Sequence, residues 1–149
     1  MRILIQRVTA ASVVVQGSVT GAIDAGLLLL VGLTHSDTEA VEDRMADKVV
    51  KLRIFSDEKG LMNRSVIDVS GGMLAVSQFT LYADAKGGNR PSYTDAARPE
   101  QASPAFDRFV AKLAARLGKP VPTGVFGADM KVSLTNDGPV TIWLDSETL

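Results

Sequence analysis

The alternation of apolar and polar side chains predicts that the N-terminal part of the chain is mostly β-sheet. Residues 1–8 alternate like a strand, and residues 12–15 and 19–23 form a hairpin pattern around Gly17. Residues 26–32 are an unbroken run of leucine and valine between two glycines, which is typical of a strand buried on both faces.

Two later segments change to a helical period. In the first, Ser36 and Glu39 predict a capping box, and apolar residues then recur at helical spacing: Val41, Met45, Val49 and Leu52. In the second, Ser103 is the predicted N-cap, Pro104 occupies the first helical position and Gly118 ends the helix. We expect two amphipathic helices from these patterns.

Strand patterns also fill the rest of the chain, at residues 53–55, 72–76, 121–126, 131–135 and 140–144. About nine strand patterns against two helices predict an α+β fold, in which a mainly antiparallel sheet curls toward a barrel. No linker and no internal repeat interrupts the pattern. At 149 residues the chain is long enough to bury a core of its own, so we expect a single domain over residues 1–149.

The residue types that are missing exclude several kinds of chemistry. The chain has no cysteine, which excludes disulfides, a thiolate nucleophile and cysteine-bound zinc. Its one histidine, His35, is the only base available to a Ser-His-Asp triad, and Ser77 lacks the Gly-x-Ser-x-Gly sequence that exposes such a nucleophile. Phosphate-binding glycine motifs are absent as well. We therefore expect neither a metal nor a cofactor.

No segment has the length of a membrane anchor or a secretion signal. The longest apolar run, residues 25–33, is too short to span a bilayer, and residues 1–5 are too short for a signal peptide. These features predict a cytoplasmic protein without a membrane partner.

Two polar stretches end apolar strand patterns. The apolar run of residues 73–76 leads into Ser77-Gln78-Phe79-Thr80, and Asn136-Asp137-Gly138-Pro139 separates the last two strand patterns. Hydroxyls, an amide and backbone N–H groups together can hold an oxyanion, which suits an activated substrate such as an ester. From the residues alone, we favour slightly a buried hydrogen-bonded network for the first stretch and an ordinary turn for the second.

The same two stretches resemble the signature motifs of the D-aminoacyl-tRNA deacylases. Ser77 to Leu81 is similar to one motif and Asn136 to Thr141 to the other. Three shorter segments are also similar to that family: Ile5 to Val8, Arg53 to Ser56 and Arg90 to Tyr93. The resemblance covers essentially the whole chain, and neither motif departs from the family pattern.

The resemblance implies a homodimeric enzyme that hydrolyses the ester between a D-amino acid and the 3′ adenosine of tRNA. It assigns four residues to catalysis and the substrate pocket: Ser77, Gln78, Phe79 and Thr80. It also implies a cis peptide bond between Gly138 and Pro139, which would enter the partner subunit's site and exclude L-amino acids. Water would be the nucleophile, because nothing in the sequence supplies a base for the Thr80 hydroxyl.

An RNA partner would have to be bound through local contacts, because the formal net charge is only −1. Arg90 is one candidate, since it lies with Tyr93 in a long loop pattern, residues 83–101, that we interpret as a lid over the site. Arg108 and Lys112 are further candidates, within an arc of about 80° on the second helix that also holds Arg116 and Lys119. A solvated helix face is the favoured interpretation of that arc. We expect no DNA partner.

Two other classes of function stay open at this stage. A non-catalytic RNA-binding domain would keep the basic contacts without needing Ser77 to Thr80. A small-molecule esterase would keep the hydroxyl site without needing RNA.

Overall fold

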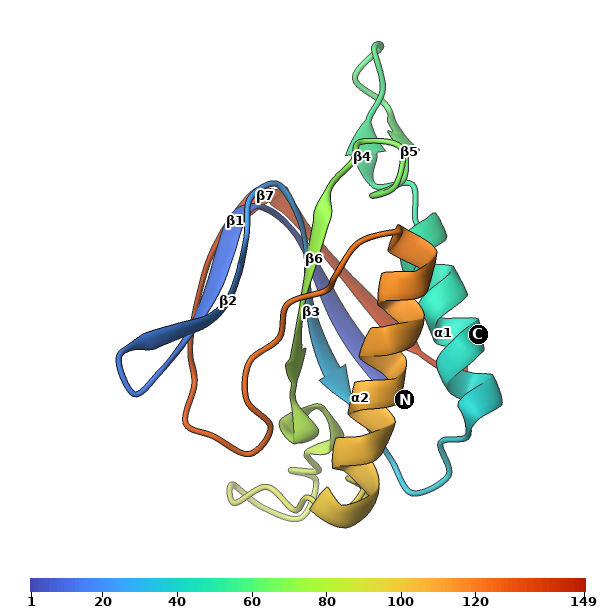
Figure 1. The fold of residues 1–149 in the computed structure, drawn as a ribbon. Helices are drawn as coiled ribbons and strands as arrows, with labels where there is room; N and C mark the ends of the chain where they lie inside the picture. Colours follow the sequence, from blue (N-terminus) through green and yellow to red (C-terminus); the bar gives the residue numbers. More distant parts are fainter.

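The computed structural model describes residues 1–149, in which one curled sheet is covered on one face by two helices (Figure 1). The helices are α1, Glu39–Lys51, and α2, Pro99–Leu117. The strands are β1 Arg2–Val15, β2 Ser18–Ile23, β3 Gly26–Gly32, β4 Phe55–Ser56, β5 Met62–Arg64, β6 Gly72–Ser77 and β7 Lys131–Asp145, and η1 Phe79–Tyr82 is a single turn of 3-10 helix. The predicted α+β class with two amphipathic helices is confirmed.

The long strand β1 organises the sheet. It pairs antiparallel with β2, β3 and β7, whereas β6 pairs parallel with β3 at the other edge. The parallel pair arises because the chain crosses over through α1 between β3 and β6, and such a crossover is what parallel neighbours require. The prediction of a mainly antiparallel sheet is therefore confirmed, with β3 and β6 as the exception.

The core lies on both faces of β3. Leu27 and Leu29 belong to the larger apolar cluster, which also contains Met45 of α1 and Phe109 of α2. Leu28 points to the opposite face, where it joins a smaller cluster that also contains Val13 of β1 and Leu74 of β6. The interpretation of residues 26–32 as a strand buried on both faces is confirmed.

Both helices begin at other residues than the sequence patterns predict. Thr38, not Ser36, caps α1, and its hydroxyl accepts a hydrogen bond from the N–H of Val41 at 3.3 Å. Helix α2 begins at Pro99, so the prediction of an N-cap at Ser103 is wrong. Proline suits the first helical position at Pro99 because that position needs no N–H donor. The structure contains no helix long and apolar enough to cross a membrane.

Two strand predictions near the C-terminus also change. Residues 121–126 form no strand and make only one bridge, between Thr123 and Ala75, because Pro122 cannot donate to a ladder. Residues 131–135 and 140–144 belong to the one strand β7, and both halves pair with β1. Between them, residues 137–140 leave the ladder opposite Arg7.

Candidate active site

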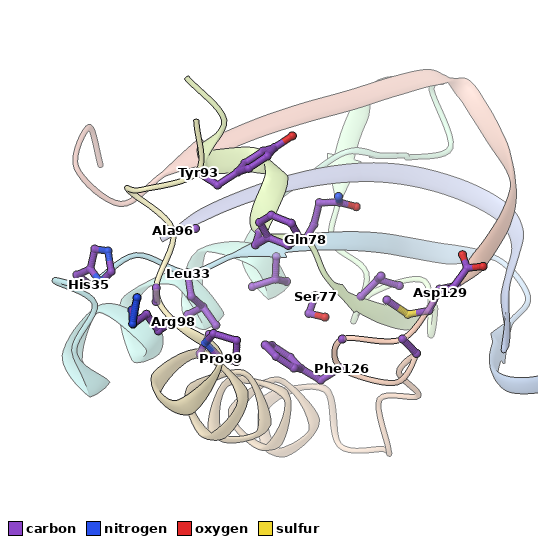
Figure 2. Close-up of a pocket in the computed structure, with 18 of the residues that line it drawn as sticks. Leu33, His35, Ser77, Gln78, Tyr93, Ala96, Arg98, Pro99, Phe126 and Asp129 are labelled. Carbon is purple, nitrogen blue, oxygen red and sulfur yellow. The ribbon is translucent and has the colours of Figure 1, made fainter. Parts of the chain in front are cut away.

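The polar stretch after β6 lies at the edge of a cavity of about 770 Å³. Ser77, Gln78 and Phe79 line this cavity, and Figure 2 shows Ser77 and Gln78 on its wall. Thr80 does not line it. All the polar side chains of the stretch are half-buried, so the structure does not contain the fully buried network that the residues alone favour.

The backbone changes direction sharply at this edge. The N–H of Gln78 makes the last bond to β3, donating to the carbonyl of Val31 at 2.8 Å, and the chain then turns into η1. The N–H groups of Phe79 and Thr80 donate no hydrogen bond within the chain, as is expected for the first residues of a helical turn. Two backbone donors are therefore available beside the cavity.

The side chains of Gln78 and Thr80 bond to each other. The Gln78 amide donates to the Thr80 hydroxyl, which leaves that oxygen occupied as an acceptor. No histidine or carboxylate is hydrogen-bonded to Thr80. The geometry supplies no general base that would make Thr80 a nucleophile.

An aromatic pair stands at the cavity wall. The rings of Phe79 and Tyr93 meet edge to face with centroids 5.0 Å apart, and the two residues remain 57% and 39% exposed. Tyr93 comes from the predicted loop, which ends at residue 98 and not at 101 because α2 begins at Pro99, and which includes the bridge between Asp84 and Ser92. Exposed aromatic faces of this kind can stack on nucleobases.

The end of the same loop is fixed to the end of β3. The hydroxyl of Thr34 donates to the carbonyl of Asp95 at 2.6 Å, and His35 Nε2 lies 2.8 Å from the carbonyl of Thr94. The loop therefore forms part of the cavity wall and contributes Tyr93, Thr94 and Ala96 to Pro99. Arg90 is exposed and does not line the cavity, whereas Arg98 does.

Sequence reasoning missed several lining residues, including His35, Arg98, Phe126 and Asp129 (Figure 2). The adjacent Arg98-Pro99 pair was a usable signal for Arg98. A proline at the first helical position places the preceding residue at the N-cap, beside the helix N-terminus. Residues 121–126 gave no such signal, because they carry the pattern of a strand that does not form. The structure shows no group of three or more histidine, cysteine, aspartate or glutamate side chains that could hold a metal ion.

Gly138 and Pro139 are joined by a cis peptide bond and lie on the surface, away from the cavity of their own chain. Asn136 closes this excursion from β7, because its side chain bonds both the N–H and the carbonyl of Val140, at 3.0 and 3.2 Å. Arg7 also contacts this excursion, because its Nε donates to the carbonyl of Asp137 at 3.1 Å.

Three of the four cations of the basic arc pair with α1, whereas Lys119 lies beyond the end of α2 and donates to the carbonyl of Ser70 at 3.0 Å. Arg108 pairs with Glu42, Lys112 with Asp43, and Arg116 with Asp47, at N–O distances of 2.7, 2.6 and 2.5 Å. The arc is therefore not a free, solvated face, which corrects the favoured interpretation. Contact of Arg108 and Lys112 with RNA stays a prediction, and their pairing with carboxylates argues against it.

The model of the family described as D-Tyr-tRNA(Tyr) deacylase matches residues 4–145. The chain belongs to this family. Two similar proteins, both named D-aminoacyl-tRNA deacylase, come from Dechloromonas aromatica and Chromobacterium violaceum. The first is 60% identical over 99% of this chain and 98% of its own, and the second is 63% identical over 98% and 97%.

Solved structures agree with the deacylase fold. A structure titled "c-Myc DNA Unwinding Element Binding Protein" is 40% identical, covers 97% of this chain and 98% of its own, and superposes with a TM-score of 0.91. A probable eukaryotic D-amino acid tRNA deacylase shares only 15% identity but has a TM-score of 0.82 over 96% of this chain and 97% of its own, and so shows the same fold. The family resemblance seen in the two motifs is confirmed.

Proposed function

We propose that this protein hydrolyses the ester that joins a D-amino acid to the 3′ adenosine of tRNA, releasing free amino acid and tRNA. As a member of the deacylase family it is a hydrolase acting on ester bonds. The tRNA would be the partner in solution and the adenosine the part held in the cavity. The apolar walls and the exposed Phe79 and Tyr93 suit a nucleobase.

The observation that carries this proposal is the pair of free N–H groups at the start of η1. Attack on an ester carbonyl creates a negative oxygen, which backbone donors stabilise most when they need no rearrangement. The N–H groups of Phe79 and Thr80 are fixed by the last bond of β6 and by the turn that follows. Such donors suffice for an activated ester.

Water is the nucleophile in this proposal. Thr80 has no base beside it, and its oxygen accepts from Gln78. The vicinal 2′-hydroxyl of the terminal adenosine is the nearest polar group that every such substrate carries, so it would assist the attacking water. The nucleophile and its helper therefore both come from outside the side chains of this protein.

Selection of the D-amino acid would come from Gly138 and Pro139 of a second copy of the chain. These residues are exposed and lie outside the cavity of their own chain, so they are free to enter another. A backbone wall reads chirality by occupying the space of the L side chain, and it needs no contact with any particular side chain. The proposal therefore requires a homodimer.

A site that works by exclusion has no means to reject glycine. A missing small apolar group is worth only about 1–3 kcal/mol in a pocket, so binding alone cannot discard glycyl-tRNA strongly. Glycyl-tRNA is therefore a substrate in this proposal, and protection of correctly charged glycine in the cell must come from outside the site.

One set of assays tests the proposal. The purified protein is incubated with D-Tyr-tRNA, L-Tyr-tRNA, glycyl-tRNA and a simple activated ester, and its mass in solution is measured by light scattering. We expect a dimer that releases D-tyrosine and glycine only. Hydrolysis of the simple ester alone would indicate a small-molecule esterase, and binding of tRNA without release would indicate an RNA-binding domain. Survival of glycyl-tRNA at enzyme levels that clear D-Tyr-tRNA would show that the exclusion mechanism is wrong.

A further inference from the structure

Four cations follow α1 from its middle to just beyond its C-terminal end, and none of them forms an ion pair with a carboxylate. Arg44, Lys48 and Lys51 follow at spacings of four and three, which places them on one face of the helix. Arg53 lies just beyond the C-cap, Leu52. All four cations are exposed, none takes part in an ion pair, and together they line a surface cleft of about 450 Å³.

The charge of this cleft is compensated only in part from within: the cleft is lined by four cations, by Asp47 and by Leu149 with the terminal carboxylate. Asp47 is the only acidic side chain on its wall, and its Oδ1 is held by Arg116 Nε at 2.5 Å. Arg44 donates one hydrogen bond, from Nη2 to the carbonyl of Ser146 at 3.0 Å, and keeps its other donors. The cations of α2 are paired, whereas those of this α1 cleft are free. In a protein of net charge −1 the excess of cations over carboxylates at this cleft is a local positive field, which favours an anionic partner.

The cleft begins in the middle of α1, at Arg44, and its far end lies about one helix length from the start of α1, which follows a wall residue of the catalytic cavity. His35 lines that cavity, and α1 begins shortly afterwards at Glu39 and runs for 13 residues, which is about 20 Å. Figure 1 shows α1 running from the end of the molecule that holds the chain before Glu39 to the end that holds the β4–β5 hairpin. Phosphates of one strand follow one another at about 3.4 Å along B-form DNA and more closely along an A-form RNA stem, so this span corresponds to roughly six nucleotides or slightly more.

We propose that the α1 cleft binds phosphates of the double-stranded acceptor stem while the 3′ end of the same tRNA occupies the cavity. This inference rests on the proposed function, because it takes the tRNA as substrate. A row of cations along a helix face matches a row of phosphates better than it matches a single small anion, for which one or two cations suffice. Such contacts hold the stem in position without reading its sequence.

The test is the salt dependence of tRNA hydrolysis. Each lost phosphate contact flattens the slope of log kcat/KM against log salt by roughly 0.7 to 0.9. We expect this change in the Lys48→Gln protein, and about twice the change when Lys51→Gln is added, with KM raised and kcat preserved. The matched control is Lys59→Gln, which removes one exposed lysine without an ion pair from the turn between β4 and β5 and should leave the slope unchanged.

A substrate without a stem separates this inference from the proposed function. D-tyrosyl-adenosine occupies the cavity alone, so the cleft variants should hydrolyse it as the unchanged protein does. Failure of the unchanged protein to release D-tyrosine from tRNA would contradict the proposed function. An unchanged salt slope in the Lys48, Lys51 double variant of an active enzyme would contradict the α1 cleft alone, and so would an equal loss on both substrates, which indicates damage to the site.

Discussion

The guanidinium Nη2 of Arg108 lies 2.7 Å from Oε1 of Glu42, whose side chain is completely buried. The Nε of the same guanidinium donates to Oε2 at 3.3 Å, so the carboxylate is held by both of its oxygens. On the next turn of α2, the Nζ of Lys112 lies 3.9 Å from Oε2 of the same glutamate. The cations of α2 therefore compensate the carboxylates of α1. This pairing explains why the cations recur at every fourth residue along α2.

Replacing Arg108 by alanine should lower stability and leave RNA affinity unchanged. The substitution leaves the buried carboxylate of Glu42 without its main partner, and we expect it to remove no phosphate contact because Arg108 is engaged by Glu42. We expect a Tm lower by several degrees and an unchanged salt slope in tRNA hydrolysis. Arg108→Lys keeps the charge and should recover part of the Tm. A flatter salt slope at unchanged Tm would instead make Arg108 an RNA contact.

Acid should weaken the contact between the two helices. The hydrogen bond from Arg116 holds the pKa of Asp47 below its usual value, and the hydrogen bond from Lys112 does the same for Asp43. A lowered pKa in the folded protein stabilises it above the unfolded pKa of about 4, and this contribution is lost as the pH falls further.

The Arg116→Ala protein provides the comparison. Urea unfolding of both proteins from neutral pH down to about pH 3 should show a free energy of unfolding that is lower in the variant at neutral pH. The difference should shrink as the acids are protonated. A difference that stays constant over this range would show that the ion pairs of Asp43 and Asp47 do not contribute.

The sequence predicts those parts of the fold that depend on neighbouring residues. The leucine run of β3 and the hairpin of β1 and β2 follow from local period. The cavity wall at Ser77 does not, because the residues alone favoured a buried network there and only the family resemblance implied a substrate pocket. The start of α2 was missed because Pro99 and Pro104 both satisfy the rule for a first helical position. The role of the α2 cations could not be read either, since their partners stand more than 60 residues away on α1.

The role of Thr80 in catalysis can be divided between its hydroxyl and its N–H. The hydroxyl is bonded to Gln78 and has no base, so Thr80→Ala should retain activity within about tenfold. Thr80→Pro removes the N–H, and loss of one oxyanion donor costs roughly a hundredfold or more in kcat. Single-turnover hydrolysis of D-Tyr-tRNA measures both rates. Loss of all activity in a folded Thr80→Ala protein, with an acyl-enzyme trapped in the unchanged protein, would make Thr80 the nucleophile.

Arg7 should control the discrimination between D- and L-substrates, if Gly138 and Pro139 form the excluding wall. Its Nη1 donates to the carbonyl of Ile54 at 2.7 Å and its Nε to the carbonyl of Asp137 at 3.1 Å, so it ties the residue before Gly138 to the segment before β4. Arg7→Ala removes both hydrogen bonds. Gly138 and Pro139 should then be displaced more easily, so that an L side chain can enter the site.

The quantity to measure is the ratio of kcat/KM for D-Tyr-tRNA to that for L-Tyr-tRNA. A hydrogen bond from a charged group contributes enough to change such a ratio by about tenfold or more, and we expect Arg7→Ala to lower it by that factor. Asp137→Asn is the control, because it removes the ion pair of Arg7 with the Asp137 carboxylate at 3.4 Å but keeps the carbonyl that Nε binds. A lower Tm with an unchanged ratio in Arg7→Ala would mean that Arg7 stabilises the fold and has no part in substrate selection.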